Sequence, residues 1–236
     1  MTIDHSPGDV RYEQHAMNEM LGSRYPGVDA DHAIIVHSGN GSHQGILDGF
    51  CAHHAGRGVD TWKLDAHFSP EGRAEGVAAW GAHVAQTTSL PVFLVGSTRR
   101  AAHIYRALHV SDVFVGAVLI GDAGPPVLPE ELHRSLRQNT KPVFFILGEK
   151  DLDSWPEMAK AAAAAAGPVE LHTLPDDVNG PMLSHPEACS DIVLEWCQRQ
   201  LSNHLNPAWK FKMSTTRRQI LDPQRKVQNV HRHHRP

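Results

Sequence analysis

Six short strand-like segments, most of them apolar runs, alternate with stretches that have helical character, and this alternation strongly constrains the fold. The expected strands lie at residues 32–37, 61–65, 91–96, 113–120, 142–147 and 169–173. The expected helices lie at about residues 44–54, 72–86, 98–108, 129–138, 155–166 and 185–201. Strands that alternate with helices form a mostly parallel sheet with helices on both faces. The sequence therefore predicts a three-layer α/β fold.

The chain divides into three parts. Residues 1–31 form a lead-in with a short helix expected over residues 10–22, ahead of the Pro26-Gly27 turn. Residues 32–202 hold the strand–helix alternation and form the α/β domain. Residues 203–236 lack that rhythm and are expected to be a basic, disordered tail.

The charge of the chain is unevenly distributed. Residues 203–236 carry eight lysines and arginines against Asp222 alone, a net charge of +7, which leaves −11 for residues 1–202. The favoured interpretation is a solvated tail, and contact with nucleic acid is the less favoured alternative. No stretch approaches the roughly 20 apolar residues that cross a bilayer, so no membrane contact is expected.

The cysteines and histidines do not form a recognisable metal or disulfide pattern. Cys51, Cys189 and Cys197 are too few and too scattered for a disulfide framework, so a reducing, cytoplasmic location is expected. The eighteen histidines are spread along the chain, and none pairs with another at convincing metal-ligand spacing. We therefore expect no metal and no cofactor. The oligomeric state is left open.

The segment 91–102 marks the candidate site. It reads as a buried strand that reaches Gly96, turns sharply and enters a helix without a linker. Open α/β sheets bind their ligands beyond the carboxyl ends of the strands, where such turns lie. The turn has the shape of a nucleophile elbow, whose pattern is G-x-S-x-G.

Together with two other strand ends, this turn resembles the α/β-hydrolase superfamily over nearly all of residues 32–201. Asp151 follows the strand at residues 142–147, where the family keeps its acid, and the loop at residues 174–184 precedes the last helix, where the family keeps its histidine. The order of turn, acid and last loop is also the family's order. The resemblance implies a compact domain without a lid insertion. It also places an oxyanion loop at Ser38, Gly39 and Asn40.

The residues in the catalytic slots depart from the family pattern. Thr98 falls in the nucleophile slot and Arg100 falls where the second glycine belongs, while Ser97 lies one residue early. A working nucleophile in such a turn has a strained backbone, which disfavours a β-branched residue. Small neighbours let the strand and helix close on it, and Arg100 is not small.

The base slot departs as well. The family's base position falls on Asn179, which does not take up a proton at neutral pH. His185 lies six residues later, at the expected start of the last helix, where Ser184 and Glu187 suit a capping box. Other histidines near strand ends or on the helix after the turn are His37, His43, His67 and His103.

Three interpretations follow. The favoured one is a divergent member of the superfamily with an impaired or non-catalytic site and a crevice for a small molecule, for which Arg99 and Arg100 favour an anion. The second is an active ester, thioester or amide hydrolase in which Ser97 or Thr98 attacks, a relocated histidine is the base, and backbone N–H groups near residues 38–39 and Arg99 hold the oxyanion. The third is a nucleotide-binding protein, because Gly39, Gly41 and Gly45 after a strand loosely mimic a dinucleotide motif.

Overall fold

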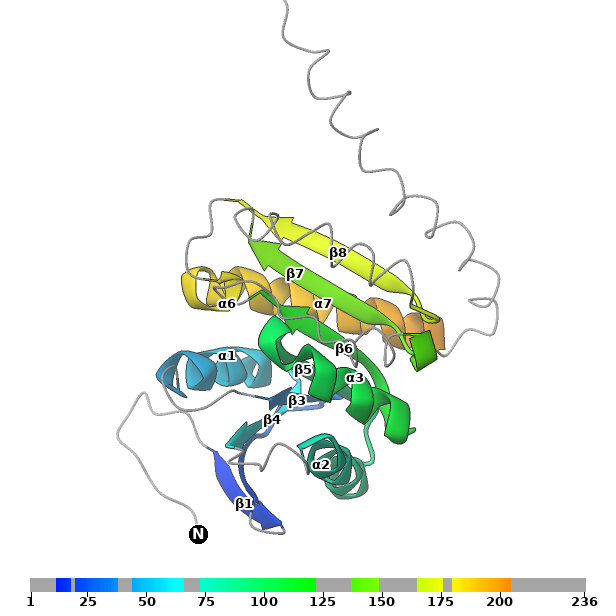
Figure 1. The fold of residues 1–236 in the computed structure, drawn as a ribbon. Helices are drawn as coiled ribbons and strands as arrows, with labels where there is room; N and C mark the ends of the chain where they lie inside the picture. The colour runs from blue at the N-terminus through cyan, green and yellow to red at the C-terminus, as the bar shows by residue number, and fades with distance from the viewer. Residues whose placement is uncertain are drawn as a thin grey trace, which may run out of the picture.

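The computed structural model describes residues 12–17, 20–37, 44–65, 73–121, 137–148, 165–175 and 180–204. They form a central sheet with helices packed on both of its faces (Figure 1). The predicted three-layer α/β architecture is confirmed.

The sheet has eight strands in the order β1-β2-β4-β3-β5-β6-β7-β8. Their bounds are β1 Glu13–Met17, β2 Met20–Tyr25, β3 Ala33–His37, β4 Asp60–Asp65, β5 Val92–Ser97, β6 Phe114–Ile120, β7 Val143–Gly148 and β8 Val169–Leu174. The strands from β4 to β8 in this order pair in parallel, whereas β1 and β2 run antiparallel to their neighbours. The six strands expected from the sequence are all present, within one or two residues of their expected ends.

Each face of the sheet is covered by a different pair of helices. Helices α1 Gln44–Gly56 and α7 Pro186–His204 pack against each other on one face, and α2 Arg73–Thr88 and α3 Ala101–Val110 pack against each other on the other (Figure 1). Two short elements join strands to helices: a 3₁₀ turn at Thr98–Arg100 before α3, and α6 Pro181–Ser184 before α7.

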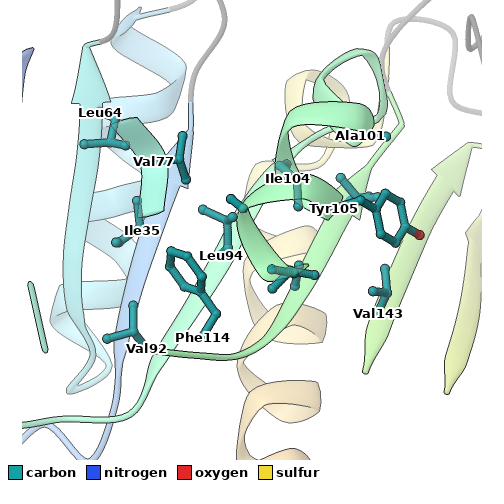
Figure 2. Packing of buried hydrophobic residues seen from close by; sticks show 14 of the residues in the cluster. Ile35, Leu64, Val77, Val92, Leu94, Ala101, Ile104, Tyr105, Phe114 and Val143 are labelled. Atoms are coloured by element: carbon teal, nitrogen blue, oxygen red, sulfur yellow. The ribbon is translucent and has the colours of Figure 1, made fainter. Parts of the chain in front are cut away.

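Alternation along the strands separates the buried side chains into two cores, because successive residues of a strand point to opposite faces. In β5, Leu94 packs with the α2 and α3 side, whereas Phe93 and Val95 pack with the α1 and α7 side. Figure 2 shows the first of these cores, with Leu94 among side chains from α2 and α3. The central strands β3, β5, β6 and β7 are apolar along most of their length because both of their faces are buried.

The helix expected over residues 10–22 is wrong. Strands β1 and β2 occupy this stretch, and they form an antiparallel pair that continues the sheet beyond β4. Gly22 explains part of the difference, because a Cβ at this position would lie 2.8 Å from the ring of the buried Trp80. The pairing of β2 with β4 and its close approach to Trp80 join parts of the chain that are distant in sequence, so the spacing of nearby apolar residues does not reveal them.

Other expectations from the sequence lie outside the described residues. They are all but the last two residues of the helix at residues 155–166, all but the end of the helix near 129–138, and the basic tail beyond residue 204; residues 165 and 166 are described and are not helical. Within the described part of the chain, no helix is long and apolar enough to cross a membrane.

Candidate functional site

The order of the strands places a switch point between β3 and β5. The chain leaves β3 for β4 on one side and later leaves β5 for β6 on the other side, so β3 and β5 are neighbours whose connections diverge. In open α/β sheets, ligands bind beyond the carboxyl ends of the strands at such a point. Here these ends are His37 and Ser97, and His37 pairs in register with Gly96. The turn that follows Ser97 therefore lies at this switch point, and a ligand site there stays a prediction.

The packing of α3 on β5 requires a glycine at position 96. A Cβ on this residue would lie 2.4 Å from Cδ1 of Ile104 and 3.4 Å from the carbonyl oxygen of His37. Ile104 belongs to α3 and is fully buried, so the missing side chain lets α3 lie directly against the end of β5. The first glycine of the elbow-like motif is therefore required by the fold itself, whether or not the site is catalytic.

Ser97 is the last residue of β5 and keeps an extended backbone, with φ −79° and ψ 155°. Alternation along the strand places its side chain on the same face as Val95, which is the face covered by α1 and α7. Its hydroxyl makes no capping hydrogen bond to the turn that follows. Ser97 is thus the end of a regular strand and not the tip of a turn.

Thr98 begins the 3₁₀ turn and is 7% exposed. Its carbonyl oxygen accepts a hydrogen bond from the backbone N–H of Ala101, which closes the turn. Among the described non-glycine residues, only Asp29 and Ser89 have positive φ. Neither Ser97 nor Thr98 therefore has the left-handed backbone in which strain is stored. The strained conformation expected for a working nucleophile is absent from both Ser97 and Thr98. At Thr98 this agrees with the β-branched side chain, which disfavours such a conformation.

The two arginines follow in the same turn. Arg100 is half-buried and occupies the position before α3, with φ −101° and ψ 5°. The backbone of Arg99 is described, but its side chain is not. The first N–H groups of a helix have no partner within the helix, so this end of the element carries a partial positive charge.

His185 lies at the junction between α6 and α7. Its carbonyl oxygen accepts a hydrogen bond from the backbone N–H of Cys189, and its side chain is exposed. It therefore takes part in starting α7, as the helix-start interpretation predicts. Within the described part of the chain, no histidine ring is hydrogen-bonded to the hydroxyl of Ser97 or of Thr98.

Five residues of the expected site lie outside the described residues. They are Ser38, Gly39 and Asn40 after β3, Asp151 after β7, and Asn179 before Gly180. Gly180 itself has φ +90°, a backbone that favours glycine, where the chain enters α6. The geometry around these five residues stays a prediction.

A buried serine–histidine pair, which the sequence analysis does not identify, lies away from the strand ends. The Ser190 hydroxyl is 3.0 Å from Nδ1 of His54, and Nδ1 is 2.9 Å from the carbonyl oxygen of Phe50. Because a carbonyl oxygen only accepts, Nδ1 carries the proton. Burial lowers the pKa of His54 to about 4, so the ring is neutral near pH 7. The pair joins α1 to α7 and has no access to solvent, which fits a structural role.

No group of three or more His, Cys, Asp or Glu side chains is arranged to hold a metal ion anywhere in the described ranges. All three cysteines are buried, and none of them forms a disulfide. Burial raises the pKa of the Cys197 thiol well above its ordinary value, so this thiol is not an activated nucleophile.

Comparison with known proteins identifies the fold. No protein-family model and no curated protein matches the sequence. Among solved structures, a dienelactone hydrolase from Anabaena variabilis superposes with a TM-score of 0.64 at 16% identity, over 80% of this chain and 98% of that one. An esterase of the bacterial hormone-sensitive lipase family gives 0.63 at 16% identity, over 82% and 86% of the two chains. Est1E from Butyrivibrio proteoclasticus gives 0.62 at 12% identity, over 81% and 99%.

These structures share the α/β-hydrolase fold, and the chain described here has that fold. The resemblance seen in the sequence is confirmed at the level of the fold. The strand order also differs from the order 3-2-1-4-5-6 that is usual for dinucleotide-binding sheets.

Proposed function

We propose that this chain is a divergent α/β-hydrolase-fold protein that binds a small molecule in the crevice beyond β3 and β5 and does not hydrolyse it. The observation that carries the proposal is the relaxed turn after β5, in which Ser97 is extended and Thr98 starts a 3₁₀ turn without positive φ. A nucleophile elbow depends on a sharp, strained strand-to-helix turn that exposes its hydroxyl.

The missing proton transfer supports the same proposal. A serine or threonine hydroxyl becomes a nucleophile only when an adjacent base takes its proton, and a third group orients that base. Asn179 in the base slot does not accept a proton, and His185 is used at the start of α7. With asparagine in the base slot, Asp151 is expected to act as an ordinary loop residue.

The proposed ligand is a small anion, such as a carboxylate or a phosphate ester. The N–H groups at the start of the helical turn and the neighbouring Arg99 and Arg100 favour negative charge at this end of the crevice. The proposed location is the cytoplasm, which fits three buried cysteines that form no disulfide.

An esterase assay tests the proposal. We expect the wild-type protein to turn over short p-nitrophenyl esters no faster than the Thr98→Ala and Ser97→Ala variants. Labelling of Ser97 or Thr98 by a fluorophosphonate probe would contradict the proposal and establish the alternative, an active ester, thioester or amide hydrolase with a relocated histidine. Binding is tested by titrating phosphate or acetate into wild-type protein and the Arg100→Gln variant, where weaker binding to the variant is expected.

Restoring the family residues tests whether the site has lost its catalytic groups. The triple change Thr98→Ser, Arg100→Gly and Asn179→His supplies a nucleophile, a small neighbour and a base in the slots that the family uses. Esterase activity gained by the triple variant, and absent from each single variant, would support an intact crevice that lacks only these groups.

A further inference from the structure

Two histidines from different elements meet where the edge strand β1 contacts α2. The ring centroids of His15, in β1, and His83, in α2, lie 5.9 Å apart in an edge-on arrangement. Both rings pack on Trp62, at 4.6 Å from His15 and 5.8 Å from His83, and His83 also lies 5.4 Å from Trp80. Both tryptophans are fully buried. The contact between β1 and α2 therefore consists of two titratable rings, His15 and His83, that pack on buried tryptophans.

The charged groups around this pair come from three strands. From β1, Glu13 places Oε2 3.5 Å from Nε2 of His15. From β2, Arg24 bonds to the same Glu13 oxygen at 3.1 Å and lies 5.4 Å from the centre of the Trp62 ring. From β4, Asp60 is already bonded to Arg24 and to Nε1 of Trp62. The Glu13 carboxylate is therefore shared by two groups that can be cationic, His15 and Arg24.

Simultaneous protonation of the two rings is opposed by repulsion between like charges. Two imidazolium rings at this separation repel each other, and the Arg24 guanidinium beside them adds to the repulsion. Burial lowers the pKa of His83, and the nearby His15 lowers it further.

We propose that His15 and His83 form a pH-sensitive clasp, which holds β1 on the domain while the rings are neutral and releases it when both are protonated. Release uncovers the outer edge of β2, whose backbone N–H and C=O groups are paired with β1 in the closed form. An uncovered strand edge is a template for pairing with another strand.

The direction of the pH dependence follows from linkage. Burial and, after it, the nearby His15 lower the pKa of His83, and the part due to His15 is present only while β1 is in place, so the closed clasp binds fewer protons than the open one. The clasp is therefore at full strength above the ordinary histidine pKa of about 6.5 and weakens as the pH falls through that value.

Hydrogen exchange of the full-length protein at pH 7.5 and 5.5, corrected for the intrinsic rate at each pH, tests the clasp. We expect protection of the amides of β1 to fall severalfold at pH 5.5, with amides of β5 and β6 unchanged. The His83→Gln and His15→Gln variants each keep only one of the two histidines, so two protonated rings can no longer repel each other. Both variants are therefore expected to lose most of this response. The matched control is His109→Gln, an exposed histidine in the last turn of α3, which is expected to keep the wild-type response.

Equal protection of β1 at the two pH values in wild-type protein would overturn the proposal, and so would a full response in His83→Gln. If a variant does not fold, histidine NMR titration of the wild-type protein decides. Coupled titration curves for His15 and His83 support the clasp, and two independent curves at the ordinary histidine value overturn it.

Discussion

A Cβ added to Gly96 would lie 2.4 Å from Cδ1 of Ile104. The end of β5 and α3 can therefore pack this closely only because residue 96 has no side chain. This contact explains why the elbow-like glycine is present in a chain whose turn is relaxed. The glycine serves the packing of the helix on the strand, which any member of the fold needs.

Removing the colliding atom should therefore rescue a substitution at Gly96. We expect Gly96→Ala alone to cost about 1–3 kcal/mol of unfolding free energy through overpacking. Ile104→Val removes Cδ1 and should cost about 0.5–1.5 kcal/mol on its own. The double variant should be more stable than the sum of the two single effects predicts, as measured by urea unfolding in a double-mutant cycle. Strict additivity would show that the two side chains do not compete for space.

Gly49, in the interior of α1, offers the opposite case. No atom lies within 4 Å of a Cβ built at this position, and φ there is not in the left-handed region. Gly49→Ala should therefore stabilise the protein by about 0.5–1 kcal/mol, because alanine loses less backbone freedom on folding. The expected rise in melting temperature is about 1–4 °C for a chain of this size. A fall in melting temperature would mean that α1 packs against something at this face.

The ion pair between Arg24 and Asp60 should contribute far more than an exposed pair. The side chain of Asp60 is 4% exposed, and its oxygens accept from Nε and Nη2 of Arg24 and from Nε1 of Trp62. Asp60→Ala leaves these donors unpaired in a buried place, so we expect a loss of about 3–5 kcal/mol in chemical unfolding. The exposed pair Arg106–Glu75 is the matched control, and Glu75→Ala should cost less than about 1 kcal/mol. Equal costs for the two variants would refute this ranking.

Stability should fall in mild acid because of His54. The pKa of this buried ring is lowered to about 4 in the folded protein, below the ordinary value of 6.5, so the unfolded chain binds more protons between these values. The contribution of the neutral ring is complete above pH 6.5 and is lost as the pH falls toward 4, on the order of 3 kcal/mol in all. Urea unfolding of wild-type protein and the His54→Gln variant between pH 7.5 and 4.5 should show a shallower pH dependence in the variant. Parallel curves would assign the acid sensitivity to other groups.

Much of the α/β domain was accessible from the sequence because its signals are local. Apolar runs such as residues 92–95 and 117–120 read as strands buried on both faces, and each expected strand is found. The helix expected over residues 10–22 is wrong because β1 pairs with β2, and β2 in turn pairs with β4 and packs closely on Trp80. Both β4 and Trp80 are distant from β2 in the sequence.

For the candidate site, the sequence by itself determined the residue types in the catalytic slots. Threonine and arginine in the elbow and asparagine in the base slot are facts of the chain, and their acid–base chemistry follows from their side chains. The tertiary structure alone decided the conformation of the turn, the contact between Gly96 and Ile104, and the meeting of His15 with His83. Backbone angles and contacts between distant elements depend on how helices pack on the sheet, which residue spacing does not encode.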